Sequence, residues 1–162
     1  MILETRHLRL VEVVVVMRPD HPLAARPYVA AEDFADEHLI IYSAPGESTV
    51  FRQVLLPAGI MPRRVSHIQL TEAIVEMVKG GMGISVFARW AVLPHVAAET
   101  LEALPLTRTG LRRQWRAAVI RGVIPDYIAE FARLVAPGPA MRQQPPARLE
   151  VKRGGADRTR SA

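Results

Sequence analysis

A strand, a helix, a glycine-rich turn and a second strand follow one another over residues 64–88, and this unit constrains the fold most. We expect its helix to begin at Thr71, whose hydroxyl would cap a free first-turn amide. An apolar stripe at helical spacing follows (Ala73, Ile74, Met77 and Val78). Gly80 and Gly81 predict left-handed backbone at the helix end, and "ISVFA" after Gly83 has the β-branched character of an interior strand. The unit predicts an α/β fold with parallel strands.

Segments of the same two kinds occupy most of the remaining chain. Strands are expected at "VEVVVVM" (11–17), at residues 39–42, and in "LEALPLT" and "QWRAAVIRG". A helix is expected after Ser48 or Thr49, either of which can cap it, and it would end at Pro57 and Gly59. A last helix is expected in "PDYIAEFARLV". Strands and helices therefore alternate along the chain.

The net charge of +5 is concentrated in the last part of the chain. Residues 137–162 hold six basic and two acidic residues, a contribution of +4, which leaves +1 for residues 1–136. A duplex-binding surface concentrates cations opposite phosphates, so the body gives little support for direct DNA binding. The tail is rich in proline, glycine, glutamine and arginine, and we predict that it is disordered.

Composition excludes several other classes of protein. The chain has no cysteine, which rules out disulfides, thiolate catalysis and cysteine-ligated zinc. The most apolar run is too short to span a bilayer, and the N-terminus does not resemble a signal peptide. We therefore expect a cytoplasmic protein without membrane contact.

Catalytic motifs are not found in the sequence. The five histidines do not form an HExxH pattern, and "GGMGIS" matches neither GxSxG, GxGxxG nor a P-loop. The acids of residues 32–37 are expected on a solvated face. His67 has two open interpretations, an effector contact or a satisfied histidine beside the sheet. We expect no enzyme, no metal and no cofactor.

Five segments in a fixed order carry a resemblance to a known family. They are "VVVVMRPDHPLA", "HLIIYS", "LPAGIMPRRV", "AIVEMVKGGMGISVFARWAV" and "LEALPLT", spread over roughly residues 11–135. Together they resemble the effector-binding domain of LysR-type transcriptional regulators. The resemblance implies two Rossmann-like lobes of the type II periplasmic-binding-protein class. A small effector would lie between the lobes, and an N-terminal winged helix-turn-helix would bind DNA.

The chain departs from this family pattern by lacking the DNA-binding segment and most of the first lobe. The expected fold is therefore α/β and periplasmic-binding-protein-like, with a complete second lobe and a partial first lobe. Residues 1–17 would be a remnant of the first lobe with the crossover strand, and residues 18–115 the effector-binding second lobe. Residues 116–136 would return to the first lobe as a strand and helix, and residues 137–162 would form the disordered basic tail.

Candidate effector-binding residues lie where strands end and helices begin, since helix N-termini there present free amides. By the family pattern, two junctions and one strand residue line the cleft (Tyr42, Ser43, Ser48, Thr49, Gln69, Leu70, Thr71 and Phe87). Each also has a structural interpretation: Thr71 caps, Phe87 packs, and the serines with Thr49 make turns. Their convergence is what favours a site, and a carboxylate would suit it.

The expected function is effector sensing, and the alternative is a stand-alone α/β solute-binding protein or small enzyme. The stretch "PDHPLA…EDFADEHLIIYS" further resembles the methionine-biosynthesis regulators of the family, whose effector is homocysteine. The expected ligand is thus an amino acid or organic acid. A missing lobe would leave apolar surface exposed, so we also expect a homo-oligomer. Contact with DNA is expected only through a helix-turn-helix that this chain lacks.

Overall fold

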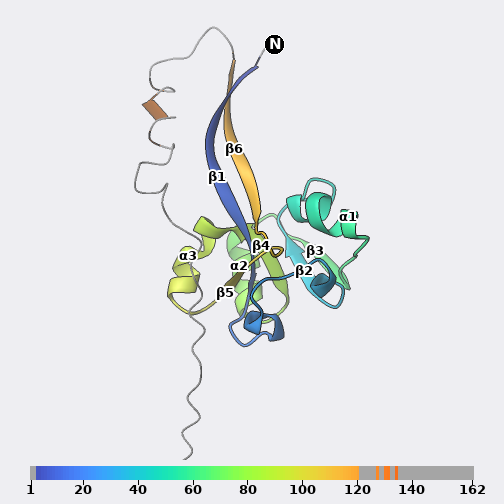
Figure 1. Ribbon diagram of the computed structural model, residues 1–162. Coiled ribbons are helices and arrows are strands. Elements are labelled where there is room, and N and C mark those ends of the chain that lie inside the picture. The colour runs from blue at the N-terminus through green and yellow to red at the C-terminus, as the bar shows by residue number, and fades with distance from the viewer. Residues whose placement is uncertain (1–2, 121–126, 128–129, 132–133, 135–162) are drawn as a thin grey trace, which may run out of the picture.

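The computed structural model describes residues 3–120 together with residues 127, 130, 131 and 134 (Figure 1). Its strands are β1 (Leu3–Met17), β2 (His38–Ile41), β3 (Arg64–His67), β4 (Ile84–Ala88), β5 (Glu102–Pro105) and β6 (Leu111–Ile120). Its helices are α1 (Leu56–Ala58), α2 (Thr71–Lys79) and α3 (Arg89–Ala97). A π-helical turn, η3 (Phe51–Leu55), leads into α1, and two 3-10 turns are η1 (Pro22–Ala25) and η2 (Glu32–Phe34).

The strands form one mixed sheet in the order β3-β2-β4-β1-β5, with β6 paired to β1. β2 is parallel to β3 and to β4, whereas β1 is antiparallel to β4, β5 and β6. The carboxyl ends of β2, β3 and β4 therefore lie at one side of the sheet, which we call the carboxyl edge. The opposite side, the amino edge, also holds the end of β1 at Met17. The expected α/β fold with parallel strands is confirmed.

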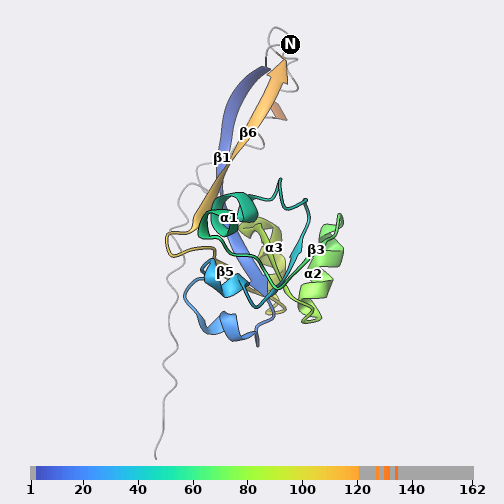
Figure 2. The same ribbon diagram turned by 90° about the vertical axis from the view of Figure 1, so that its right-hand side faces the viewer.

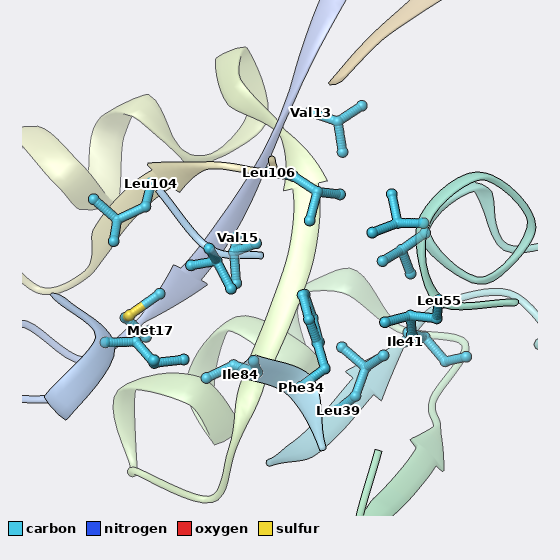
Figure 3. Packing of buried hydrophobic residues seen from close by; sticks show 14 of the residues in the cluster. Val13, Val15, Met17, Phe34, Leu39, Ile41, Leu55, Ile84, Leu104 and Leu106 are labelled. Carbon is cyan, nitrogen blue, oxygen red and sulfur yellow. The ribbon is translucent and has the colours of Figure 1, made fainter. Parts of the chain in front are cut away.

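The valine-rich part of β1 lies inside the sheet, between β4 and β5, where both faces are covered. Val13, Val15 and Met17 pack with η1, η2 and the helix of residues 49–58 (Figure 3). Val14 and Val16 point to the other face and pack with α2 and α3. All five are at most 6% exposed. Since side chains alternate along a strand, only a strand covered on both faces buries every residue of such a run.

The glycine-rich turn ends α2 with a Schellman motif. The amide of Met82 donates to the Met77 carbonyl at 3.0 Å, and that of Gly81 donates to the Val78 carbonyl at 2.9 Å. Gly81 has a φ of 72°, as expected. Gly80 has a φ of −71°, so the expectation of left-handed backbone there is wrong. One left-handed residue satisfies the last carbonyls of the helix, and a second is not needed.

Gly83 allows the turn to pass close to the start of β2. A Cβ atom on Gly83 would lie 2.3 Å from the carbonyl oxygen of His38. The His38 ring fixes the same turn, with Nδ1 2.6 Å from the Met82 carbonyl oxygen and Nε2 2.8 Å from Ser66 Oγ. Because a carbonyl oxygen only accepts, Nδ1 carries the hydrogen, and neutral His38 accepts from the Ser66 hydroxyl. His38 therefore joins β2, β3 and the turn before β4.

β1 and β6 continue beyond the sheet as a two-stranded ribbon, visible in both views (Figures 1 and 2). β4 pairs with β1 only from Val13 onward, and β5 only from Val14 onward. Val13 is the register partner of Ala88, the last residue of β4, so the ribbon leaves from the carboxyl edge. We call residues 3–12 and 107–120 the ribbon, and residues 13–106 the lobe. The strand expected at 11–17 and residues 114–120 of the strand expected in "QWRAAVIRG" are thus parts of longer strands, while residues 121 and 122 lie outside the described residues.

One helix was missed by the sequence analysis, and two of its expectations fall largely or wholly outside the described residues. α3 was not predicted, because Pro94 lies inside it and proline usually interrupts a helix. The helix expected in "PDYIAEFARLV" falls largely outside the described residues, of which 127, 130, 131 and 134 have helical backbone. The tail, residues 137–162, lies wholly outside them. Within the described part of the chain, no helix has both the length and the apolar character needed to cross a membrane.

Candidate functional site

The two expected site segments leave the sheet side by side at the carboxyl edge. Ile41, the last residue of β2, is the register partner of His67, the last residue of β3. The amide of Ile68 then donates to the Ile41 carbonyl at 2.9 Å, which continues the pairing past both strands. Residues 42–49 and 69–71 therefore start from adjacent strand ends. We call these two segments the rim.

The second rim segment is open to solvent. Gln69, Leu70 and Thr71 are all exposed, and Leu70 keeps 57% of its surface accessible although it is apolar. Leu70 is the N-cap residue of α2, with extended backbone at φ −140° and ψ 109°. Because its side chain stays exposed at the N-terminus of the helix, Leu70 contributes little to the core of the lobe. It is therefore available to contact an apolar part of a ligand.

The start of α2 carries unpaired amides rather than a side-chain cap. The helix begins at Thr71 as expected, but no side chain caps it, so the expected capping bond of the Thr71 hydroxyl is wrong. The first hydrogen bond of the helix runs from the Ile74 amide to the Leu70 carbonyl at 3.1 Å. The amides of Thr71, Glu72 and Ala73 thus have no partner within the helix. They form a positive helix end that faces the carboxyl edge.

The first rim segment combines exposed and buried polar residues. Tyr42 is 56% exposed, Ser43 and Thr49 are half-buried, and Ser48 is only 6% exposed. The Ser48 amide donates to the Ala44 carbonyl at 3.0 Å. Ser48 is therefore a turn residue in this structure, and its burial separates it from the accessible members of the rim.

A second helix starts at the end of this segment. The Arg52 amide donates to the Ser48 carbonyl at 3.0 Å, which is the first bond of the helix that continues into η3 and α1. The helix therefore begins where the sequence predicted. The hydroxyls of Ser48 and Thr49 make no capping hydrogen bond within the described residues. The first-turn amides of this helix therefore have no partners within the helix, like those at the start of α2.

Phe87 lies level with the rim but contributes to the core. Phe87 follows Ser85, the register partner of Ile40, by two residues and is the second-last residue of β4, so it lies near the carboxyl edge. Its side chain is half-buried and packs against the cluster of Val14, Val16 and the residues of α2 and α3. The packing role named as the alternative for Phe87 is therefore present in the structure.

A third helix start at the same edge escaped the sequence analysis. β4 ends at Ala88, the N-cap residue of α3, and no side chain caps this helix either. Arg89, its first residue, has Nε 3.7 Å from Oε2 of Glu12 on β1, and both side chains are about one-third exposed. The repeated strand-to-helix order after β2 and β3 was the available signal, and Pro94 concealed it.

The polar groups at the carboxyl edge are suited to binding. The described residues contain no group of three or more His, Cys, Asp or Glu that could hold a metal ion. His67 is exposed at the end of β3, where it borders the rim. Amides, hydroxyls and an exposed tyrosine can hold a small polar molecule by hydrogen bonds.

Known proteins of one family match both the sequence and the fold. The LysR substrate binding domain family matches residues 2–138. The regulator MetR of Escherichia coli K12 is 39% identical over an alignment of 117 residues, which covers 68% of this chain and 35% of MetR. The chain thus spans about a third of that curated relative.

Solved structures agree with this match. The regulatory domain of MetR from N. meningitidis has a TM-score of 0.75 at 30% identity, over 82% of this chain and 62% of that one. The CcmR regulatory domain of Synechocystis, solved in complex with 2-PG, has a TM-score of 0.70 at 24% identity. The match covers 82% of this chain and 65% of the CcmR chain. The latter likeness is one of fold alone. The type II periplasmic-binding-like fold and the resemblance to methionine-type regulators are confirmed, and the chain belongs to the LysR substrate binding domain family.

Proposed function

We propose that the rim binds a small-molecule effector and that this chain is the sensing part of a LysR-type transcriptional regulator. One observation carries the proposal. The segments that leave the adjacent strands β2 and β3 each lead into a helix, and the first-turn amides of both helices lack helical partners. Such paired helix starts favour an anionic group at their ends. Membership of a family described as substrate-binding supports a bound small molecule, and the CcmR regulatory domain, similar in fold, was solved in complex with 2-PG.

The chemistry of the rim favours an amino acid or an organic acid. The amides of Thr71 and Glu72 can donate to a carboxylate, and Gln69 can donate or accept beside them. The exposed carboxylates of Glu47 and Glu72 can accept from an ammonium group. Homocysteine, which carries both groups, is the effector that we propose from the likeness to MetR.

The rest of the assignment follows from this proposal. Residues 18–115 would be the effector-binding lobe, while residues 1–17 and 116–136 would belong to the first lobe. The regulator would act in the cytoplasm as a homo-oligomer. It would contact DNA through a helix-turn-helix that is not among the residues of this chain. The ligand would be held without being transformed, because the proposed contacts are hydrogen bonds and apolar packing.

A titration that also examines the ligand afterwards tests sensing against catalysis. The chain is titrated calorimetrically with L-homocysteine, then with a panel of amino acids and organic acids. The bound compound is recovered and analysed by mass spectrometry. We expect saturable binding and unchanged ligand. A consumed ligand would support the small-enzyme alternative, and absence of binding by every compound in the panel would contradict an effector site on this chain.

A further inference from the structure

Arg89 places a cation at the start of α3, on the same edge of the sheet as the rim. β4 lies between β2 and β1, so Arg89 follows the strand next to the one from which the first rim segment leaves. α2 and α3 cover the same face of the sheet and pack into one apolar cluster. Because packed helices lie about 8–10 Å apart, a ligand held at the start of α2 would lie roughly one helix spacing from Arg89. The long arginine side chain and the ligand together can bridge that distance.

The ion pair of Arg89 with Glu12 is loose. Nε lies 3.7 Å from Oε2, whereas a charge-assisted N–H···O hydrogen bond spans about 2.7–2.9 Å. Both side chains are about one-third exposed, and neither makes a hydrogen bond to another described residue. By contrast, Arg26 lies 2.6 Å from Asp33, whose carboxylate also accepts from the Ala30 amide at 2.8 Å and is only 10% exposed. An exposed pair without hydrogen bonds adds little stability, so Arg89 can readily change partners.

The backbone of Arg89 is held in place although its side chain is loosely paired. Ala88 before it pairs with β1, and Trp90 after it contacts Trp115 of β6 edge to face. Val92, in the same turn of α3, is 1% exposed in the core. The guanidinium can therefore change partners without movement of the helix.

The rim needs such a cation if it is to hold an acid. The lobe has seven basic and ten acidic residues, a formal charge of −3, and Glu47 and Glu72 are exposed on or beside the rim. Amides at a helix start supply only a partial positive charge. Arg89 starts the helix that shares a face with α2, whereas Arg52 lies on a helix that covers the other face. Of these two arginines, Arg89 is the better placed to meet an anion at the start of α2.

We propose that Arg89 is a specificity-determining residue that binds the carboxylate of the effector, and that Glu12 holds its guanidinium until the effector arrives. This rests on the proposed function, because it requires that the rim binds an acid. A planar guanidinium can donate two parallel hydrogen bonds to a carboxylate. An acidic effector would thereby replace one loose contact by two short ones. A ligand with no anionic group gains nothing from Arg89 and leaves it paired with Glu12, so the pair favours acids over uncharged ligands.

Calorimetric titration with L-homocysteine, or with the tightest acid of the panel, tests this role of Arg89. Arg89→Gln should weaken binding at least about tenfold, because the carboxylate loses a bidentate partner. Arg89→Lys keeps the charge but loses the planar fork, so its loss should be smaller. Arg64→Gln is the matched control, since Arg64 is exposed at the start of β3 on the amino edge, and it should bind like the wild type.

The positioning role of Glu12 is tested by a double-mutant cycle. Glu12→Gln should strengthen binding about threefold or more, because the guanidinium no longer has a competing carboxylate. The same change in the Arg89→Gln background should have almost no effect, since Glu12 acts through Arg89. Glu32→Gln, at an exposed site that precedes β2 on the amino edge, is the matched control and should leave the affinity unchanged.

The results separate this proposal from the proposed function. If the wild type binds and Arg89→Gln binds equally well, this proposal alone is overturned. The same conclusion follows if Glu12→Gln weakens binding or strengthens it alike in both backgrounds. If the wild type binds no compound of the panel, the proposed function fails and this proposal fails with it. Should Arg89→Gln not fold, the titrations of Arg89→Lys and Glu12→Gln still decide, because the first must bind more weakly and the second more tightly than the wild type.

Discussion

Trp90 and Trp115 meet edge to face, with ring centroids 5.9 Å apart and planes at 88°. Trp90 lies in the first turn of α3 and Trp115 on β6, so the contact joins the ribbon to a helix that begins at the carboxyl edge. The two are the only tryptophans in the chain. Aromatic pairs of this geometry add about 1 kcal/mol beyond the area they bury.

The tryptophan pair should give a coupled circular dichroism signal in the far ultraviolet. Because the electronic transitions of the two indoles interact at this separation, the tryptophan contribution to the wild-type spectrum should differ from the sum of the contributions of the two separate indoles. Trp90→Phe and Trp115→Phe each retain one indole and serve as mutual controls. If the wild-type tryptophan signal equals the sum of those two variants, the rings do not meet in solution.

Gly83→Ala should strongly destabilise the lobe. The added Cβ would lie 2.3 Å from the His38 carbonyl oxygen, so the turn or β2 must move. We expect a loss of at least ~2 kcal/mol in the free energy of unfolding, measured by urea denaturation. Gly46→Ala is the matched control, because its Cβ would meet nothing within 4 Å, and it should change stability little. Equal stability of the two variants would contradict the close approach at Gly83.

Neutral His38 should be the tautomer with hydrogen on Nδ1. Its Nδ1 faces the Met82 carbonyl and its Nε2 faces the Ser66 hydroxyl, which can donate. Nitrogen-15 spectra of the imidazoles, recorded where they are neutral, should show Nδ1–H for His38. His38→Ala should destabilise the lobe by about 1–3 kcal/mol, since the histidine joins three segments. Finding the hydrogen on Nε2 would refute this assignment.

The elements that were predicted correctly from the sequence are those whose apolar residues pack mainly within the lobe. Residues 11–17 were predicted correctly as a strand, because residues 13–17 are all buried between two covered faces. The strand-helix-strand unit of residues 64–88 was also right, although β2 lies between its two strands. Both segments carry an apolar pattern that is long enough to identify a strand or a helix from the sequence alone.

The errors arise in segments whose structure depends on contacts with residues that are distant in the sequence. Residues 3–7 do not alternate between apolar and polar, and pairing with β6 makes residues 3–10 part of a strand. α3 contains Pro94, which local propensity disfavours and tertiary packing tolerates. Thr71 was expected to cap α2, but the helix begins one residue too early for that role, so Leu70 occupies the N-cap position.

The candidate site was partly accessible from sequence for a topological reason. Ends of parallel strands share one edge, so residues 42–49 and 69–71 could be placed together without coordinates. Exposure could not be predicted in the same way: Ser48 is only 6% exposed, and Phe87 is half-buried and packs against the core.

The central claim is that free backbone amides at the start of α2 hold the effector. Thr71→Pro removes one of these amides with little strain, because proline suits the first helical position. Leu70 before it already has the extended backbone that precedes proline, with φ −140° and ψ 109°. Thr71→Ala removes only the hydroxyl, and Glu76→Ala changes an exposed residue further along the same helix.

Calorimetric titration of these variants with L-homocysteine, or with the tightest compound of the panel, is the most direct measurement. The account predicts at least about tenfold weaker binding by Thr71→Pro, a smaller loss for Thr71→Ala and wild-type affinity for Glu76→Ala, all with unchanged melting temperatures. Wild-type affinity in Thr71→Pro would contradict it.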